Sequence, residues 1–256
     1  MLYADEMADI RMAVIGAGSW GTTVASVAAA NTPTVLWARR EFVVQAINTD
    51  HVNPDYINSV PLSAKLRATS SLEEAVSSAD VLVMAVPSQG FRQVLEEAKP
   101  FLRPWVPVVS LSKGLEAGSM LRMSEVAKQV LPGHPVAVLT GPNLASEISL
   151  GQPAATVVAI DDAVIATALQ ELFSSPTFRV YTNPDVVGCE IGGVVKNVVA
   201  IASGISQGFG FGENSKATLV TRGLAEMSRL GVALGAQSAT FSGLAGMGDV
   251  MATCAS

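Results

Sequence analysis

Two groups of residues in this sequence have the types and spacing for chemistry, and the first is a run of glycines near the N-terminus. Gly16, Gly18 and Gly21 follow the pattern G-x-G-x-x-G. Where this pattern follows a strand and opens a helix, the glycines allow a tight turn, close approach of a pyrophosphate and close packing of helix on strand. The helix N-terminus adds amide donors and a dipole that favours phosphate. The run therefore predicts a dinucleotide site; the alternative is a glycine turn that binds no nucleotide.

The second group centres on Lys196, which lies in the apolar run 192–199. A buried ammonium without a partner tends to lose its proton, a property that suits a proton donor or acceptor. Hydride delivery to a ketone leaves negative charge on oxygen, which a positioned acid or preorganised donors must neutralise. Lys196 could do either, and Asn197 could help to orient the neighbouring groups. The alternative is a structural lysine that snorkels or pairs with an acid such as Glu190.

Two further segments follow predicted strands. Lys113 lies in Ser-Leu-Ser-Lys-Gly, and ligands of open parallel sheets collect at the carboxyl ends of strands. Lys113 is therefore placed to meet a substrate or a nicotinamide; the alternative is an ordinary loop cation. The segment 140–147 also follows a strand, and Asn143 is predicted to cap a helix whose first amides could contact a ligand.

A glycine-rich turn near the C-terminus carries a single acid. Asp249 ends the segment 243–249, and Thr253 follows it. An acid brought beside Lys196 would favour the charged form of the lysine and fix its direction.

The residues after the second predicted strand bear on the choice of cofactor. The usual acid for the adenine ribose is missing there, because the sequence reads Ala-Arg39-Arg40 with no acid before Glu41. Two arginines could grip a ribose 2'-phosphate through charge-assisted hydrogen bonds. The sequence therefore predicts that NADPH binds more tightly than NADH. The alternative is a solvated charge pair at the end of a strand.

Composition narrows the class of protein. The chain has 256 residues, of which 49% are hydrophobic and 15% charged, so it can bury a large core in one or two domains. A formal net charge of -6 and a pI near 4.9 argue against nucleic acid as a partner, because binding its phosphates needs clustered Lys and Arg. A small anionic ligand remains compatible with a few basic residues in one cleft.

Cysteines, histidines and the N-terminus bear on compartment and metal binding. Cys189 and Cys254 provide no disulfide framework and favour a cytoplasmic protein with reduced thiols. The first ten residues lack the basic and apolar regions of a signal peptide. His51 and His134 have no metal-ligand spacing around them, so no metal is predicted.

The apolar run 191–209 raises the question of a membrane span. A central lysine such as Lys196 costs roughly 2.5 to 3.5 kcal/mol on insertion scales. We therefore predict a buried helix in place of a span.

The elements that must position these residues alternate between short apolar runs and amphipathic stretches, a pattern typical of strand and helix units in a parallel sheet. The predicted strands are 12–15, 34–37, 81–86, 106–111, 136–139 and 154–160. The predicted helices include 20–30, 71–77, 90–99, 120–130 and 162–173.

The pattern changes at Pro184, after which helical periodicity continues to about residue 234. Proline biases the preceding residue away from helix, which favours a boundary there. The predicted fold is α/β: a Rossmann-type, doubly wound dinucleotide-binding domain over 10–184 and an all-α substrate domain over 185–256.

Taken together, these residues resemble one family, the bacterial glycerol-3-phosphate dehydrogenases that use NAD or NADP. The matching segments are GAGSWGT (16–22), SKG (112–114), GPNLASE (141–147), VVKNVVAIASGI (194–205) and GLAGMGDVMATC (243–254). They span nearly the whole chain in the order of the family.

The resemblance implies a reversible reduction of dihydroxyacetone phosphate to sn-glycerol 3-phosphate, which feeds glycerophospholipid synthesis. Lys196 would act as proton donor or acceptor, with Lys113 and Asp249 beside the reacting carbon. The implied dinucleotide contacts include Gly16, Gly18, Ser19, Trp20, Gly21, Arg39, Arg40, Lys113 and Ala145. The implied substrate contacts are Lys113, Gly141, Asn143, Lys196, Asn197, Asp249 and Thr253.

The sequence departs from the family at two places. Many relatives have serine or threonine where this chain has Asn143, whose amide offers both donor and acceptor. In the family, a Ser-Arg-Asn group that grips the substrate phosphate follows the position of Cys254, whereas this sequence ends at Ser256. We therefore expect an incomplete helical domain that keeps cofactor binding, has weakened catalysis, and exposes apolar surface that a partner subunit covers in a homodimer.

Two rival functions remain open at this stage. One is a related two-domain dehydrogenase that acts on another hydroxy acid or acyl substrate. The other is a non-catalytic NAD(P)H-binding module that senses redox state, in which a buried Lys196 and Asp249 would have no purpose.

Overall fold

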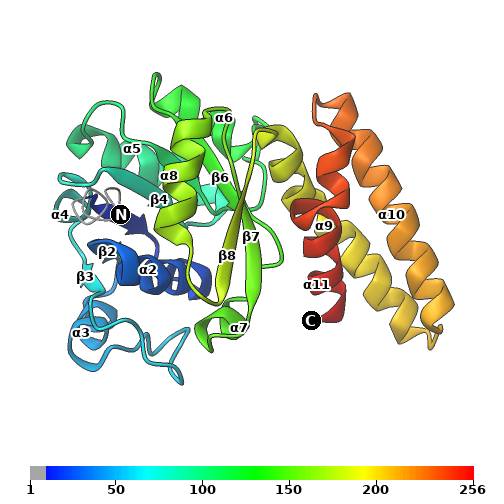
Figure 1. The fold of residues 1–256 in the computed structure, drawn as a ribbon, viewed down its shortest axis with the longest axis horizontal. Helices are drawn as coiled ribbons and strands as arrows, with labels where there is room; N and C mark the ends of the chain where they lie inside the picture. Colours follow the sequence, from blue (N-terminus) through cyan, green and yellow to red (C-terminus); the bar gives the residue numbers. More distant parts are fainter. Residues whose placement is uncertain (1–9) are drawn as a thin grey trace.

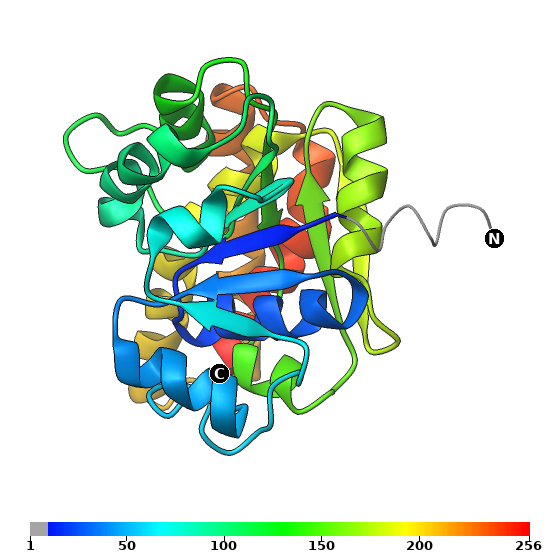
Figure 2. The same cartoon turned by 90° about the vertical axis from the view of Figure 1, so that its left-hand side faces the viewer.

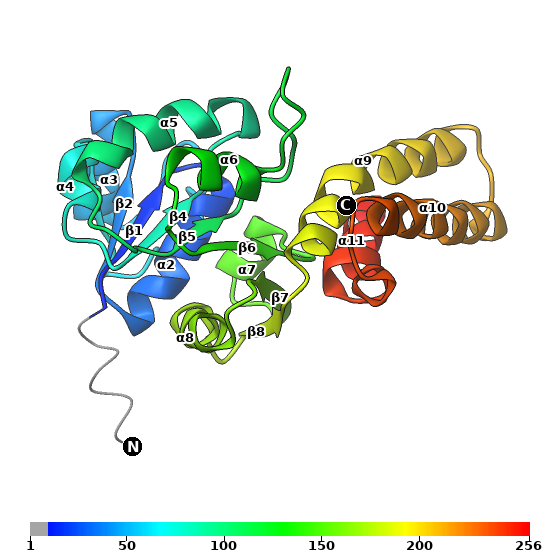
Figure 3. The same cartoon turned by 90° about the horizontal axis from the view of Figure 1, so that it is seen from above.

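The structure of the protein is a computed structural model that describes residues 10–256 (Figure 1). The sequence-based prediction about a signal peptide concerns residues 1–9 and lies outside the described part. Residues 10–183 form a sheet with helices, and the helices after residue 185 lie to one side of it (Figures 1 and 3).

The sheet has eight strands in the order β3-β2-β1-β4-β5-β6-β7-β8. Their bounds are β1 (Met12–Ile15), β2 (Thr34–Trp37), β3 (Arg67–Thr69), β4 (Val81–Met84), β5 (Val108–Ser110), β6 (Val136–Thr140), β7 (Ala154–Ala159) and β8 (Phe178–Asn183). All six predicted strands are confirmed. The strands β3 and β8 were not predicted.

The helices connect these strands and continue beyond them. Those of the sheet part are α2 (Ser19–Asn31), α3 (Glu41–Asp50), α4 (Leu72–Val76), α5 (Phe91–Ala98), α6 (Met123–Val130), α7 (Ala145–Ser149) and α8 (Ala163–Phe173). The five predicted helices correspond to α2, α4, α5, α6 and α8. The predicted start of α6 at residue 120 was wrong, because Met120 has a positive φ of 59° and the helix begins at Met123.

Helices cover both faces of the sheet, as the doubly wound prediction requires. Alternate residues of a strand point to opposite faces, and β1 shows this directly. Met12 and Val14 pack with α2, α3 and α8, whereas Ala13 and Ile15 pack with α4, α5 and α6. The strand β1 is therefore buried throughout, and Figure 2 shows β1, β2 and β3 side by side with the C-terminal helices behind them.

The sheet is not parallel throughout, which corrects the prediction of successive parallel units. The strands β3 to β6 pair in parallel, but β7 pairs with β6 in the antiparallel sense. The segment between β6 and β7 holds only the five-residue α7, whose axial length of about 7 Å is too short to carry the chain back along the sheet. The longer α8 allows β7 and β8 to pair in parallel.

The helical part consists of α9 (Val186–Gly208), α10 (Glu213–Ala233), the short η3 (Ser238–Ser242) and η4 (Leu244–Gly248), and α11 (Asp249–Ala255). Asp185 caps α9 by accepting a 2.8 Å hydrogen bond from the Gly188 amide. Its other carboxylate oxygen accepts from the Gln237 amide and from the Thr240 hydroxyl, at 2.9 and 2.6 Å. One buried acid therefore fixes where α9 begins and holds η3 against it.

Within residues 10–256, α9 is the one helix long and apolar enough to cross a membrane by length and composition. Core helices of globular proteins pass the same test. The α9 helix packs against α10, α11 and β6, and half of its most apolar window is buried. These contacts support the prediction of a buried helix.

Two glycines on α9 provide a matched test of this packing. A Cβ at Gly192 would collide with the carbonyl oxygen of Ala245, whereas a Cβ at Gly204 meets no atom within 4 Å. We expect Gly192→Ala to lower the free energy of unfolding by about 1–3 kcal/mol through overpacking. Gly204→Ala should raise it by up to about 1 kcal/mol, because alanine favours a helix over glycine. Urea unfolding measures both, and equal effects would contradict the assigned packing.

Candidate active site

The glycine turn joins β1 to α2 with the geometry that its sequence predicts. Gly16 has a φ of 117°, and a Cβ there would lie 2.5 Å from the carbonyl oxygen of Ala85. A Cβ at Gly21 would collide with the carbonyl oxygen of Gly16, so this glycine lets α2 pack close to the turn. Gly18 faces open space, with nothing within 4 Å. Because no side chain caps α2 at Gly18, the first amides of the helix remain available to a ligand.

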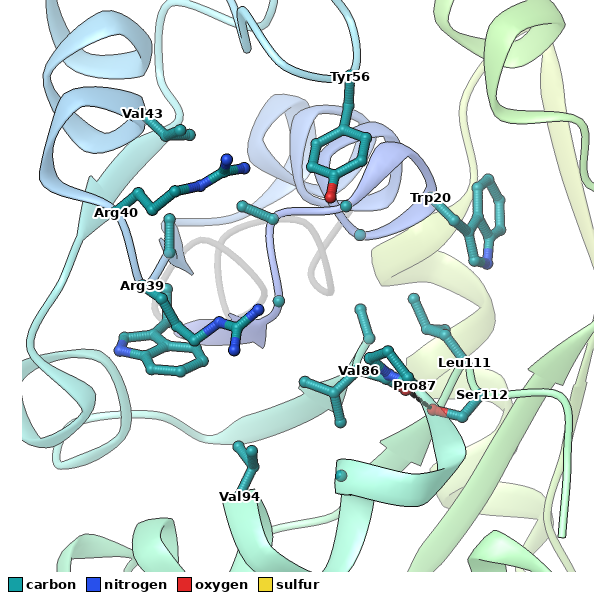
Figure 4. Close-up of a pocket in the computed structure, with 18 residues that line it drawn as sticks. Trp20, Arg39, Arg40, Val43, Tyr56, Val86, Pro87, Val94, Leu111 and Ser112 are labelled. Carbon is teal, nitrogen blue, oxygen red and sulfur yellow. Dashed lines mark hydrogen bonds between the residues drawn. The ribbon is translucent and has the colours of Figure 1, made fainter.

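A cavity of about 500 Å³ opens beside this turn (Figure 4). Arg39, Arg40 and Tyr56 line one side of it, and Leu111 and Ser112 line the other. The residues of the predicted cofactor set that line the cavity are Gly16, Gly18, Trp20, Gly21, Arg39 and Arg40. Ser19, Lys113 and Ala145 do not line it: Ser19 lies between the lining residues Gly18 and Trp20, Lys113 directly follows the lining residue Ser112, and Ala145 begins α7.

The two arginines after β2 differ in their partners. Arg40 forms an ion pair with Asp55 and lies over the ring of Phe42, 5.3 Å from its centroid. Arg39 has no ion-pair partner among residues 10–256. The nearby Glu41 accepts a 2.6 Å hydrogen bond from the Ser70 hydroxyl. A positive group without a protein counter-ion therefore remains at the cavity wall.

The other predicted residues meet at the carboxylate of Asp249, the first residue of α11. Lys113 Nζ lies 2.6 Å from Oδ2 of Asp249, and Lys196 Nζ lies 2.5 Å from Oδ1. Asp249 is 1% exposed. The structure therefore brings together three residues that lie far apart in the sequence, and it places two ammonium groups on one buried carboxylate. The alternative pairing of Lys196 with Glu190 was wrong.

Each ammonium group has one N–H left over. Lys196 also donates to the Thr253 hydroxyl at 2.8 Å, and Lys113 also donates to the carbonyl of Gly141 at 3.0 Å. The Thr253 hydroxyl in turn donates to the carbonyl of Asp249, so its lone pair faces Lys196. With two of three protons committed on each lysine, one donor on each remains for a ligand.

The cluster lies next to the cavity. Lys113 directly follows Ser112, which lines the cavity and whose hydroxyl donates to the carbonyl of Val86 at 2.5 Å. Burial lowers the pKa of Lys113 to about 8, although the charge of Asp249 opposes this and the charge of Lys196 reinforces it. Burial therefore moves the pKa of Lys113 toward neutrality, a shift that the sequence did not predict for this residue.

Asn143 does not cap a helix, which corrects a second prediction. The α7 helix begins at Ala145 with Leu144 as its N-cap residue and no side-chain cap. Asn143 Nδ2 instead donates to the Thr156 hydroxyl at 2.9 Å, and that hydroxyl donates to the carbonyl of Thr140. This chain of bonds fixes the orientation of the amide and leaves its Oδ1 buried without a partner.

Some residues that line the cavity were not predicted from the sequence, and one predicted residue, Asn197, forms no hydrogen bond with the lysine cluster. Val86 and Pro87 line the cavity after β4, where the rule about carboxyl ends of strands could have found them. Tyr56 comes from a loop with no recognisable signal. Asn197 is exposed and makes no side-chain hydrogen bond to residues 10–256. In the same range no three His, Cys, Asp or Glu side chains gather in a way that could hold a metal ion.

Comparison with known families and sequences follows the same division of the chain. Residues 11–166 match the family described as NAD-dependent glycerol-3-phosphate dehydrogenase N-terminus, and residues 185–256 match the corresponding C-terminus family. The chain is 57% identical over 247 residues to glycerol-3-phosphate dehydrogenase (NAD(P)+) 2 of Sphingopyxis alaskensis, covering 96% of this chain and 74% of that protein. The corresponding enzyme 1 of Mycobacterium tuberculosis is 53% identical, with 96% and 72% covered.

Solved structures show the same similarity. The crystal structure of glycerol-3-phosphate dehydrogenase from Coxiella burnetii matches with a TM-score of 0.90 at 37% identity, covering 96% of this chain and 76% of that chain. The enzyme from Saccharomyces cerevisiae matches with a TM-score of 0.88 at 29% identity, covering 97% and 78%. A ketopantoate reductase family protein from Ralstonia eutropha matches at 16% identity with a TM-score of 0.57, which shows shared fold alone.

The lowered pKa of Lys113 gives a direct test of the cluster. Trinitrobenzenesulfonate reacts with neutral amines, so we expect labelling of Lys113 to rise with pH through a midpoint near 8. Peptide mass spectrometry measures the extent of labelling, with the exposed Lys128 as the reference for the reagent. A midpoint at the ordinary lysine value of 10.5 would contradict a buried ammonium at this position.

Proposed function

The chain belongs to the family of NAD-dependent glycerol-3-phosphate dehydrogenases, and from this premise we propose that it reversibly reduces dihydroxyacetone phosphate to sn-glycerol 3-phosphate with NADPH or NADH. The observation that carries the proposal is the buried carboxylate of Asp249 between the ammonium groups of Lys113 and Lys196, where Lys113 directly follows the cavity-lining Ser112. A three-carbon phosphate fits such a site because it brings a carbonyl oxygen to donors and an anionic group to a positive region.

The glycine turn fits a dinucleotide. The open space at Gly18 and the uncapped start of α2 provide room and amide donors for a pyrophosphate. When bound, the nicotinamide supplies hydride to the carbonyl carbon of the substrate. The residues that we propose for this role are Gly16, Gly18, Ser19, Trp20, Gly21, Arg39, Arg40, Lys113 and Ala145.

The lysines then handle the charge that forms on the substrate oxygen. As the new C–H bond forms at the carbonyl carbon, the electron pair of the C=O bond moves to oxygen. Lys196 Nζ gives its uncommitted proton to that oxygen, and the resulting amine stays beside Asp249. Lys113 contributes a second N–H and, below its pKa of about 8, a positive charge.

The remaining substrate contacts extend this cluster. Gly141 supplies the carbonyl that holds Lys113, and Thr253 supplies the hydroxyl that holds Lys196. Asn143 has a fixed amide orientation that suits a substrate hydroxyl. The full proposed set is Lys113, Gly141, Asn143, Lys196, Asn197, Asp249 and Thr253.

We also propose how the protein is organised and where it works. Residues 10–184 form the dinucleotide-binding domain, residues 185–256 form the substrate domain, and the product feeds glycerophospholipid synthesis. Val198, Ile201 and Ile205 on α9 are 70, 64 and 57% exposed, which supports a homodimer that sedimentation velocity can detect. The free thiols of Cys189 and Cys254 support a cytoplasmic location.

Replacing Lys196 tests its role in turnover. We expect Lys196→Ala to lower kcat for dihydroxyacetone phosphate by about 10²–10³-fold or more, because the developing oxyanion loses its proton donor. The dissociation constant for NADPH should change less than about twofold, since Lys196 lies outside the cavity lining. Lys128→Ala, at an exposed position on α6, is the matched control. Undiminished turnover in the Lys196 variant would overturn the assignment.

Arg39 tests the preference for NADPH. We expect the chain to bind NADPH more tightly than NADH, because Arg39 forms no ion pair within residues 10–256 and can pair with the 2'-phosphate. Arg39→Ser should weaken NADPH binding about tenfold, as loss of a charge-assisted hydrogen bond worth about 1.5 kcal/mol implies, and leave NADH binding nearly unchanged. Fluorescence titration measures both, with Arg67→Ser as the control. Tighter binding of NADH by the unmodified chain would refute the preference.

A further inference from the structure

A second buried carboxylate, that of Glu190 on α9, has no part in the reaction described above. Glu190 is 6% exposed and accepts three hydrogen bonds, all from the start of α6. The Ser124 amide donates to it at 2.8 Å, the Ser124 hydroxyl at 2.5 Å, and Arg122 Nη1 at 2.7 Å. These bonds join α9, the helix that carries Lys196, to the start of α6 in the sheet part.

Stability alone is a weak reason for this ion pair. Burial raises the pKa of Glu190, against the effect of its donors, so keeping the carboxylate charged costs free energy. Replacing a buried ion pair by apolar side chains is often neutral or stabilising. We therefore look for a role of Glu190 in holding other residues in position, because hydrogen bonds to a carboxylate are directional.

Arg122 is tied to the segment that carries the other lysine. Its backbone forms an isolated antiparallel bridge with Leu115, and the Glu116 amide donates to the Leu121 carbonyl at 2.9 Å. The loop 115–122 is therefore closed at its base, two residues beyond Lys113. Any shift of Arg122 must move the end of the segment that holds Lys113.

These contacts form a closed ring through the site. It runs from Lys113 to Leu115, across the bridge to Arg122, through Glu190 into α9, and along the helix to Lys196. The Glu190 and Lys196 positions are separated by about 9 Å along the axis of α9. Asp249 completes the ring by binding both lysines.

We propose that Glu190 is a positioning residue, which through Arg122 and Ser124 holds Lys113 and Lys196 at the separation that one carboxylate can bridge. The proposal rests on the function proposed above, because it concerns the same two lysines. Asp249 begins the short α11 directly after the glycine-rich η4, whereas the contact of Glu190 with the start of α6 joins α6 to the long α9. The contact of Glu190 with α6 therefore sets the distance between Lys113 and Lys196 that the Asp249 carboxylate spans.

The test is Glu190→Gln, which keeps the size of the side chain and removes its charge. We expect kcat to fall about tenfold and the KM for NADPH to change less than twofold. The charged groups that face Lys113 are Asp249 and Lys196, and burial is what lowers its pKa. We expect a looser contact between Glu190 and α6 to let water reach Lys113 and so weaken this effect of burial. The midpoint for labelling of Lys113 should therefore rise above its value near pH 8. A purely structural role would lower the melting temperature without moving this midpoint.

Glu125→Gln is the matched control. Glu125 lies on α6 and pairs with Arg122 at 2.9 Å, but among residues 10–256 it forms no hydrogen bond or ion pair with α9. This variant should keep kcat and the Lys113 midpoint. If Glu190→Gln does not fold, Ser124→Ala removes one of the three bonds and should shift both readouts in the same direction, about two- to threefold in kcat.

Several outcomes would overturn the proposal. One is an unchanged kcat and midpoint in Glu190→Gln, and another is an equal effect in Glu125→Gln. A loss of NADPH binding that matches the loss of kcat would point to general disruption and also count against it. If the unmodified chain fails to turn over dihydroxyacetone phosphate, the proposed function is wrong, while the Lys113 midpoint still decides whether Glu190 positions that lysine.

Discussion

The structure depends on one electrostatic constraint, the sharing of the Asp249 carboxylate by two ammonium groups. Without this anion, Lys113 and Lys196 would place two positive charges close together in a partly buried site, which is costly. Asp249 is the first residue of α11, where the helix dipole favours negative charge. The glycine-rich η4 leads directly into it and packs on Gly192, whose missing side chain lets η4 approach α9. The position of the carboxylate therefore follows from the close packing of η4 and α9.

The constraint joins the sheet part of the chain to the helical part. Lys113 comes from the loop after β5, Lys196 from the middle of α9 and Asp249 from α11. Apolar contacts alone would allow the helical part to slide against β6 and β7, because hydrophobic burial is not directional. Charge pairs with short, directed hydrogen bonds select one arrangement. The polar contacts of Glu190 with the start of α6 restrict the position of the helical part at a further point.

Much of the fold could be predicted from the sequence, and each part that could not has a physical reason. Short apolar runs bounded by turn residues gave the central strands, because strands buried on both faces must be apolar throughout. The strand β8 escaped because every second residue is exposed at its start, as in Phe178, Arg179 and Val180, and the strand β3 has only three residues. The antiparallel direction of β7 could not be predicted, since an apolar pattern has no direction. In the site, the spacing of glycines predicted the turn, but the pairing of Arg40 with Asp55 and of Asn143 with Thr156 depends on loops that sequence patterns do not place.

The count of protons in the lysine cluster bears on which direction of reaction the site favours. Each ammonium has two protons committed to protein acceptors and one left over, so the uncommitted groups of the cluster are donors. Such a site receives the oxyanion of a ketone that is being reduced. In the reverse direction of the proposed reaction, the alcohol returns its proton to Lys196, the group that gives it in reduction, and burial lowers the pKa of the neighbouring Lys113 to about 8. Because Asp249 holds the two lysines together, loss of the proton from Lys113 leaves Lys196 with the whole of the carboxylate's attraction. The two lysines are therefore unequal partners: in the proposed reaction Lys196 exchanges the proton, while Lys113 sets the pH at which the cluster loses one positive charge.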